Sequence, residues 1–151
     1  MKLHKISPPL FKRLQHYLIR FTIQHGDNRI THQAIRWLKR LKPFELKNGT
    51  IIIVAIDNKK LVGLVAFGNY GIEESFCVVH PHYRNKGIGE RLLKHSFQYL
   101  NRVYTRVATD NIPSLKVCFS SGLVAFRLVK GPTGKPTFLF GGGDWKAEEI
   151  K

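Results

Sequence analysis

Two apolar segments joined by a short polar turn restrict the fold of this chain more than any other feature. Residues 51–56 and 61–67 are apolar and rich in branched side chains, and the polar residues 57–60 lie between them. Because so short a connection can join only antiparallel neighbours, the two segments predict a β-hairpin. Another turn at 68–71 then predicts a third strand at 72–79. Successive hairpins exclude the parallel sheet of the doubly wound nucleotide-binding folds.

The first third of the chain predicts two helices. Apolar residues recur there at helical spacing, and Ser7 is a plausible cap for the first helix. Two more helices are expected at 87–100 and 113–121. A chain of 151 residues fits one domain, 1–151, whose two leading helices form a basic part at about 1–47.

The remaining strands complete an α+β fold, with a mixed and mostly antiparallel sheet flanked by helices. The helix at 87–100 would join the third strand to the next one in a strand–helix–strand crossover. Residues 141–143, three glycines, are expected to form a flexible turn. Further strands are expected at 102–109, 123–129 and 137–140, and residues 1–6 are the only segment that could supply a short leading strand.

The segment 77–93 carries most of the chemical information. A hydrophobic strand runs into a basic loop, and Gly87 and Gly89 then open an amphipathic helix. The start of a helix leaves backbone N–H groups without partners, and glycine lets an anion approach them closely. Arg84 and Lys86 add positive charge, so the segment predicts a phosphate-binding site, although a strand-to-helix turn that binds nothing has the same composition.

This segment is neither of the two best-known phosphate loops. The Walker pattern Gly-x-x-x-x-Gly-Lys-[Ser/Thr] is missing, and residue 92 is Leu where Gly-x-Gly-x-x-Gly needs its third glycine. It resembles instead the signature of the GNAT superfamily of acyl-CoA-dependent N-acyltransferases, [Gln/Arg]-x-x-Gly-x-[Gly/Ala] at the start of a helix. Residues 84–89 match it, and residues 79–81 match the Val-x-Pro that often precedes it.

A second block of that family is matched approximately. The pattern Asn-x-x-[Ala/Ser]-x-x-x-Tyr-x-x-x-Gly-Phe corresponds to residues 111–123. Cys118 stands where the family has the tyrosine often proposed as general acid, and Leu123 replaces the phenylalanine. The resemblance therefore supports cofactor binding more strongly than it supports any catalytic residue.

The resemblance implies the α+β GNAT fold and direct attack of an amine on the thioester of acetyl-CoA. The pyrophosphate would bind the backbone amides of the loop, and the pantetheine arm would run along the preceding strand, where the Val79 N–H would stabilise oxygen charge. Asn111 would hydrogen-bond the arm or the substrate, and Ser114 is as suitable for a helix cap as for a cofactor contact. The implied cofactor-binding residues are Cys77, Val78, Val79, Arg84, Asn85, Lys86, Gly87, Ile88, Gly89, Asn111 and Ser114.

The attacking amine must be neutral, so a base has to accept its proton. Glu73 and Glu74 lie before the loop, and strand alternation would place them on opposite faces, so one of them is expected to be the catalytic base. His80 and His82 are alternative bases. As metal ligands they lack a third partner in sequence, so no metal site is expected.

No residue near Cys118 in sequence makes it a nucleophile or an acid. Free cysteine is commonly buried, so Cys118 is expected to be a small packing residue. Tyr83 and Tyr104 are alternative proton donors to the departing thiolate. The residues alone do not decide between them.

The charge of the chain is unusual. Twenty-five Lys and Arg against ten Asp and Glu give a net charge of +15. In residues 1–47 eleven basic residues stand against two acidic ones, which leaves +9. Such a field attracts polyanions, so a nucleic acid or a ribosome is a candidate partner, and the alternative function is a basic nucleic-acid-binding or adaptor module with weak or lost catalysis. A polycationic acceptor is disfavoured unless its pocket is locally acidic.

Cysteine content and hydropathy bear on location. Two cysteines without C-x-x-C spacing predict neither a disulfide framework nor a structural zinc site. Lysines and arginines interrupt every apolar stretch near the start, so neither a signal peptide nor a transmembrane segment is expected. These features predict a cytoplasmic protein.

Overall fold

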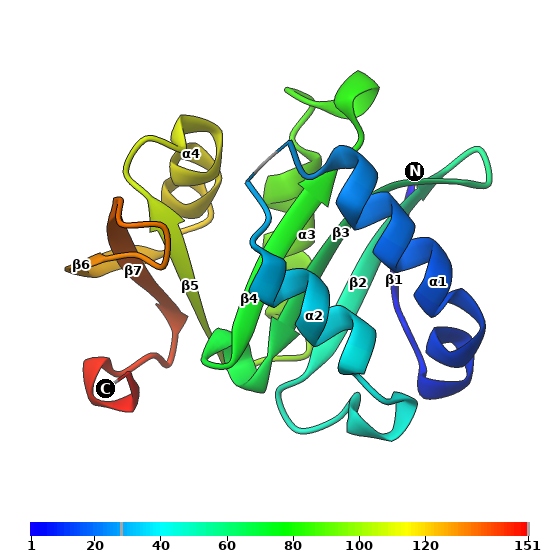
Figure 1. Ribbon diagram of the computed structural model, residues 1–151, viewed down its shortest axis with the longest axis horizontal. Coiled ribbons are helices and arrows are strands. Elements are labelled where there is room, and N and C mark those ends of the chain that lie inside the picture. The colour runs from blue at the N-terminus through cyan, green and yellow to red at the C-terminus, as the bar shows by residue number, and fades with distance from the viewer. Residues whose placement is uncertain (28, 151) are drawn as a thin grey trace.

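A computed structural model describes residues 1–27 and 29–150, and its strands form two antiparallel sheets (Figure 1). The hairpins predicted from the sequence are confirmed, and the leading strand that the sequence left open is formed by Lys2–Lys5. The first sheet has the order β1-β2-β3-β4, with β1 (Lys2–Lys5), β2 (Ile51–Asp57), β3 (Lys60–Gly68) and β4 (Glu74–Val79). The second has the order β5-β7-β6, with β5 (Arg102–Ala108), β6 (Val124–Lys130) and β7 (Pro136–Gly143).

The helices cover both faces of the first sheet, with α1 and α2 on one side and α3 on the other (Figure 1). Side-chain oxygens cap three of them: Ser7 accepts from Leu10 N, Thr31 from Ala34 N and Asn111 from Ser114 N. The helices are α1 (Pro8–His25), α2 (His32–Arg40), α3 (Ile88–Ser96) and α4 (Ile112–Ser120). None of the described helices is both long and apolar enough to cross a membrane.

The helix α3 ends earlier than expected, at Ser96 instead of residue 100. The Ser96 hydroxyl donates to the Leu93 carbonyl at 2.5 Å and competes with the backbone ladder. The N–H groups of residues 97–99 bond three residues back rather than four, so the chain tightens into turns. This shortens the helix by one turn without moving its N-terminus.

Alternating strand residues divide the core into two layers. Ile52 and Leu64 pack among α1 and α2, whereas Ile53 and Val65 pack on the opposite face, with α3 and the second sheet. All four are almost completely buried. The first sheet is therefore a rigid central layer, and β4 is its outer strand.

The strands β4 and β5 are joined by the crossover through α3 but do not pair with each other. Every strand pairing among the described residues is antiparallel, so the one parallel pair of a mixed sheet is not formed. The Ser75 hydroxyl donates to Thr105 Oγ1 at 2.8 Å near the start of β4, and Figure 1 shows the strands diverging beyond that point. Divergence leaves the outer edge of β4 without a strand partner.

The three glycines at 141–143 are not a flexible turn. They belong to β7 and pair with the first residues of β5. A Cβ on Gly141 would lie 2.5 Å from the Trp145 ring, which in turn stacks on Phe126 at a centroid distance of 4.8 Å. The glycines are therefore strand residues that let aromatic side chains approach the backbone.

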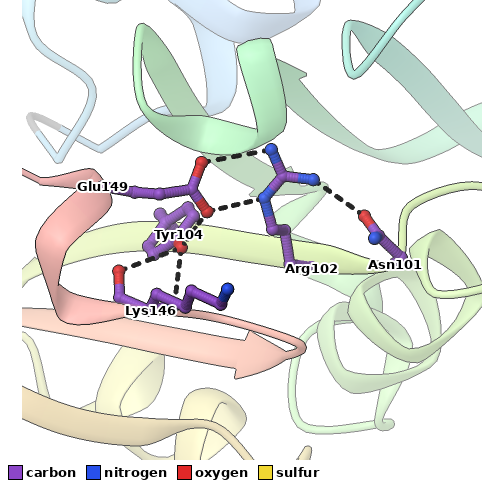
Figure 2. A network of polar contacts seen from close by, with 5 residues as sticks. All are labelled: Asn101, Arg102, Tyr104, Lys146 and Glu149. Carbon is purple, nitrogen blue, oxygen red and sulfur yellow. Dashed lines mark hydrogen bonds and ion pairs between the residues drawn. The ribbon is translucent and has the colours of Figure 1, made fainter.

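A polar network holds the C-terminal segment against β5 (Figure 2). Glu149 accepts from Arg102 Nε at 2.7 Å and from the Tyr104 hydroxyl at 2.5 Å. The Lys146 N–H donates to the same hydroxyl at 2.8 Å. Tyr104 is only 2% exposed, and burial followed by the hydrogen bond to Glu149 raises the pKa of its phenol. The Tyr104 side chain therefore has a structural role and points toward the C-terminal segment.

Replacing Tyr104 with phenylalanine should therefore lower stability and leave the acetyl transfer implied by the resemblance intact. Lost hydrogen bonds to Glu149 and Lys146 predict a decrease in the free energy of unfolding of about 1–3 kcal/mol, measured by urea denaturation. Tyr17→Phe, on an exposed tyrosine of α1, is the matched control and should change little. A large loss of kcat with unchanged stability would instead assign Tyr104 to the chemistry.

Candidate active site

The loop between β4 and α3 presents a row of backbone donors. Asn85 and Gly87 adopt left-handed conformations, with φ of 62° and 77°. Within the described part of the chain, no acceptor lies within hydrogen-bond distance of the N–H groups of residues 85–90. These groups include the first N–H groups of α3, where the helix dipole is positive, so the loop is suited to hold an anion.

The loop lies where three elements meet. A Cβ on Gly89 would lie 3.5 Å from a Val117 methyl group on α4 and 3.9 Å from the Cys77 Sγ on β4. The Cys77 side chain is exposed, yet desolvation raises the pKa of its thiol to about 12. The Cys77 side chain therefore lies next to the loop that carries the unpaired amides.

Arg84 does not point into the loop. Its Nε donates to the Val79 carbonyl at 3.0 Å, its Nη2 donates to the His25 carbonyl at 2.9 Å, and its Nη1 pairs with Asp27. Arg84 was expected to add positive charge beside the anion site. Its side chain instead links the end of α1 to the end of β4. Lys86 is exposed, and no ion pair engages it within the described residues, so it supplies positive charge to the loop.

The outer edge of β4 carries the amides of alternate residues. His80 N donates to Val62 O at 2.8 Å. This bond and the register with β3 determine which residues of β4 direct their backbone N–H and C=O groups toward β3. By antiparallel alternation the backbone groups of Val78 also face β3, while those of Cys77 and Val79 face outward. The Val78 side chain is buried among the residues under α1 and α2. Its predicted contact with the cofactor does not fit this placement, whereas Cys77 and Val79 remain suitable.

The second sequence block forms the start of α4. Asn111 is the N-cap, and its Oδ1 accepts from Ser114 N at 3.5 Å. Ser114 is thus the capped residue rather than the cap. The Asn111 carbonyl oxygen is engaged, and only its side-chain NH₂ group could donate to a ligand.

The two candidate bases do not lie on opposite faces of a strand. Strand β4 begins at Glu74, so Glu73 belongs to the preceding turn. The alternation of side chains between the two faces of a strand therefore does not apply to Glu73. Glu73 accepts from Trp37 Nε1 at 3.0 Å, and both carboxylates line one pocket. Desolvation raises the pKa of Glu74, against smaller opposing effects of the Ser75 N–H and Arg106.

The pocket beside these carboxylates includes residues that the sequence reading missed. It has a volume of about 310 Å³ and opens between α2 and the start of β4. Four of its residues lie at positions i, i+3, i+4 and i+7 of α2, a spacing visible in the sequence as one helix face. The lining residues are Gln33, Arg36, Trp37, Arg40, Glu73 and Glu74.

The histidines of the loop lie at the other end of β4. The His80 ring packs against His25, with 4.6 Å between centroids, and its Nδ1 accepts from His82 N at 3.1 Å. Desolvation, followed by the nearby Lys60, lowers the pKa of His80. Within the part of the chain that the structure describes, no group of three or more His, Cys, Asp or Glu could hold a metal ion.

The remaining candidate donors are occupied elsewhere. A hydrogen bond to Asp57 raises the pKa of Tyr83, and its ring lies between His80 and Lys86. Cys118 is 5% exposed within the core, and burial raises the pKa of its thiol to about 12. A thiol that holds its proton so tightly is a poor donor to a thiolate whose own pKa is near 8.5.

Cys118→Ala should therefore keep near-normal catalysis. We expect kcat within about threefold of the wild-type value, and a decrease in the free energy of unfolding of about 1 kcal/mol from the lost packing. Thiol release gives the rate, and Cys118→Val should restore part of the stability. A hundredfold loss of kcat with normal CoA binding and normal stability would make this cysteine the acid.

Solved structures share this fold. An acetyltransferase of the GNAT family from Streptococcus pneumoniae is 19% identical, covers 93% of this chain and 97% of its own, and has a TM-score of 0.66. A ribosomal-protein-S5-alanine acetyltransferase from Vibrio fischeri is 19% identical over 95% of this chain and 94% of its own, with a TM-score of 0.70. A spermidine N-acetyltransferase from Vibrio cholerae is 18% identical over 93% and 92%, with a TM-score of 0.67. At these identities the likeness establishes the fold alone.

Sequence comparison gives the family directly. No curated protein is similar enough to count as a relative. The sequence model of the Acetyltransferase (GNAT) family, however, matches residues 12–118, which include the anion-binding loop and most of α4. The family implies acetyl-CoA as cosubstrate and an amine as acceptor. The resemblance read from residues 84–89 is confirmed, and the chain belongs to the GNAT acetyltransferase family.

Proposed function

We propose that this N-acetyltransferase binds acetyl-CoA along the outer edge of β4 and receives its amine acceptor from the α2 side. The observation that carries this proposal is the row of unpaired amides at 85–90 beside an unpaired strand edge. The two features suit the two ends of one ligand. A pyrophosphate needs a concave set of N–H groups, and an amide-bearing arm needs a strand edge.

The cofactor contacts follow from this placement. The amides of Asn85, Lys86, Gly87, Ile88 and Gly89 bind the pyrophosphate, and the Lys86 ammonium adds charge. Cys77 and Val79 offer outward backbone groups to the pantetheine arm, which runs from the loop toward the start of β4, and an outward N–H of this edge stabilises the developing oxygen charge. The Asn111 NH₂ group donates to the arm. Arg84 acts indirectly, because it fixes the Val79 carbonyl and the loop that follows.

Glu74 is the proposed base. Its carboxylate is partly buried at the start of β4 and lines the pocket through which the amine would arrive. It accepts the ammonium proton, the nitrogen then bonds to the thioester carbon, and the carbon–sulfur bond breaks. The electron pair of the broken bond leaves with the CoA sulfur. No proton donor to this sulfur is needed, because a thiolate is a tolerable leaving group. Glu73 is held by Trp37 and helps to orient the site.

The test is binding followed by turnover. Calorimetry should show CoA binding to the wild-type protein, and thiol release with an amine panel should identify acetyl transfer. Absence of CoA binding to the folded protein would reject the proposed site.

The outer face of α1 supports a polyanionic partner as an addition to catalysis. Lys12, Arg13 and Arg20 are exposed, and α1 contains no acidic residue. Such a face favours salt-sensitive binding to RNA. A cytoplasmic location, where acetyl-CoA and polyanions coexist with reduced cysteines, suits both activities. Loss of RNA retention in Lys12→Gln/Arg13→Gln, without loss of acetyl transfer, is the expected result.

A further inference from the structure

The pocket at the start of β4 contains both signs of charge. Arg36 and Arg40 lie four residues apart on α2, about 6 Å along its axis, and both are exposed. Glu73 and Glu74 line the opposite side. A volume of about 310 Å³ suits a small molecule, at the lower end of ordinary ligand pockets.

These charges do not neutralise one another. Among the described residues, neither arginine lies within 4.0 Å of a carboxylate, and Glu74 has no ion-pair partner at that distance. Glu73 accepts only the neutral indole N–H of Trp37. Opposite charges that line one small pocket without pairing remain available to a ligand that carries both.

Trp37 keeps the two sides apart. Its ring is 6% exposed and packs on Gly68, where a Cβ would lie 2.9 Å from the ring. It also contacts Phe76 edge to face at a centroid distance of 6.1 Å. These contacts and the hydrogen bond from Trp37 to Glu73 fix the position of α2 relative to the two carboxylates.

Resting on the proposed function, we propose that the acceptor is a small zwitterion, an amine that carries a carboxylate or a phosphate a few bonds from its nitrogen. The ammonium group lies against Glu73 and Glu74, where Glu74 can take its proton. The anionic group pairs with Arg36 and Arg40, because guanidinium groups match carboxylate and phosphate oxygens in a bidentate manner.

The charge of the whole protein supports the same class. A net charge of +15 repels polycations, and Arg106 adds positive charge close to Glu74. A polyamine would place its second ammonium beside two arginines, whereas an anionic group is attracted to them. The acceptor class thus differs from the spermidine acted on by one structural neighbour.

The experiment compares matched acceptors. Thiol release is measured with amino acids and their carboxamides, with 2-aminoethyl phosphate and ethanolamine, and with spermidine. We expect kcat/KM for the best anionic amine to exceed that of its neutral counterpart at least tenfold, and the carboxylate and phosphate arms identify which anion is preferred. Arg36→Gln and Arg40→Gln should each raise KM for the anionic amine with little change in kcat, and Lys39→Gln, on another face of α2, is the control.

Two outcomes separate this inference from the function on which it rests. If CoA binds and a neutral amine or spermidine is acetylated better than every anionic amine, the inference is wrong and the function stands. If calorimetry detects no CoA binding, the proposed function itself fails. A preference for anionic amines that survives in both glutamine variants would also overturn the assignment to Arg36 and Arg40.

Discussion

Glu74→Gln is expected to lower kcat about 100-fold, which corresponds to about 2.7 kcal/mol. The amide has nearly the same shape and cannot accept the proton of the acceptor amine. CoA binding should be unchanged, because the anion-binding loop lies at the far end of β4. Calorimetry with CoA and steady-state thiol release together separate these effects.

The pH dependence of the wild-type enzyme should report the same residue. Desolvation raises the pKa of Glu74, so the basic form appears only above the range of an ordinary glutamate. We expect kcat/KM to rise with pH through this raised pKa and the rise to disappear in Glu74→Gln.

The stability of that variant gives an independent check. A carboxyl group whose pKa is raised by folding stabilises the protein below its unfolded pKa, and this contribution is lost as pH rises through the folded pKa. Glutamine resembles the neutral form, so the variant should be at least as stable as wild type at pH 7. Glu73→Gln is the matched control, with a smaller effect on kcat. Near-wild-type rates for both variants from pH 6 to 9 would place the base elsewhere.

Gly87→Asp is expected to weaken CoA binding about 100-fold, or about 2.7 kcal/mol. A Cβ at Gly87 would meet nothing within 4 Å, and aspartate tolerates the left-handed backbone, so the fold should survive. The added carboxylate would lie beside the amides that we assign to the pyrophosphate. A negative charge there also favours the N-terminus of α3, so stability should hold while affinity falls.

Two control variants separate the effect of the negative charge at position 87 from the effect of adding a side chain. Gly87→Asn has the same shape without the charge and should weaken CoA binding much less. Gly122→Asp places the same side chain at another open left-handed glycine, after α4, and should leave CoA affinity near its wild-type value. Equal affinity of Gly87→Asp and wild type for CoA would reject the loop as the pyrophosphate site.

Several features of the site could be read from the sequence because they depend on near neighbours. The loop at 84–89 owes its free amides to the start of a helix and its conformation to Asn85 and Gly87. The capping of α4 by Asn111 needs a partner only three residues away. Capping, turn chemistry and hydrophobic periodicity act over a few residues, so the sequence predicts them directly.

Other features required partners that are distant in the chain. Arg84 was expected to face the cofactor, but its guanidinium bonds instead to the His25 carbonyl and to Asp27, which are 59 and 57 residues away in the chain. The strand alternation assumed for Glu73 does not apply, because β4 begins at Glu74, and the Glu73 carboxylate instead bonds to Trp37 on α2. Side-chain direction at such positions is decided by packing and pairing that local propensity does not contain.

The sequence alone determined that this chain forms antiparallel hairpins, followed by a strand, a glycine-containing loop and a helix. These follow from the periods of its apolar residues and the conformational freedom of its glycines, and both are properties of short segments. Only the tertiary structure decided that β4 and β5 diverge after Ser75, which exposes the outer backbone groups of Cys77 and Val79. It alone also brought Arg36 and Arg40 opposite Glu73 and Glu74. The reason is that strand pairing and helix docking minimise the free energy of the whole core, and residues tens of positions apart become neighbours only when that core is packed.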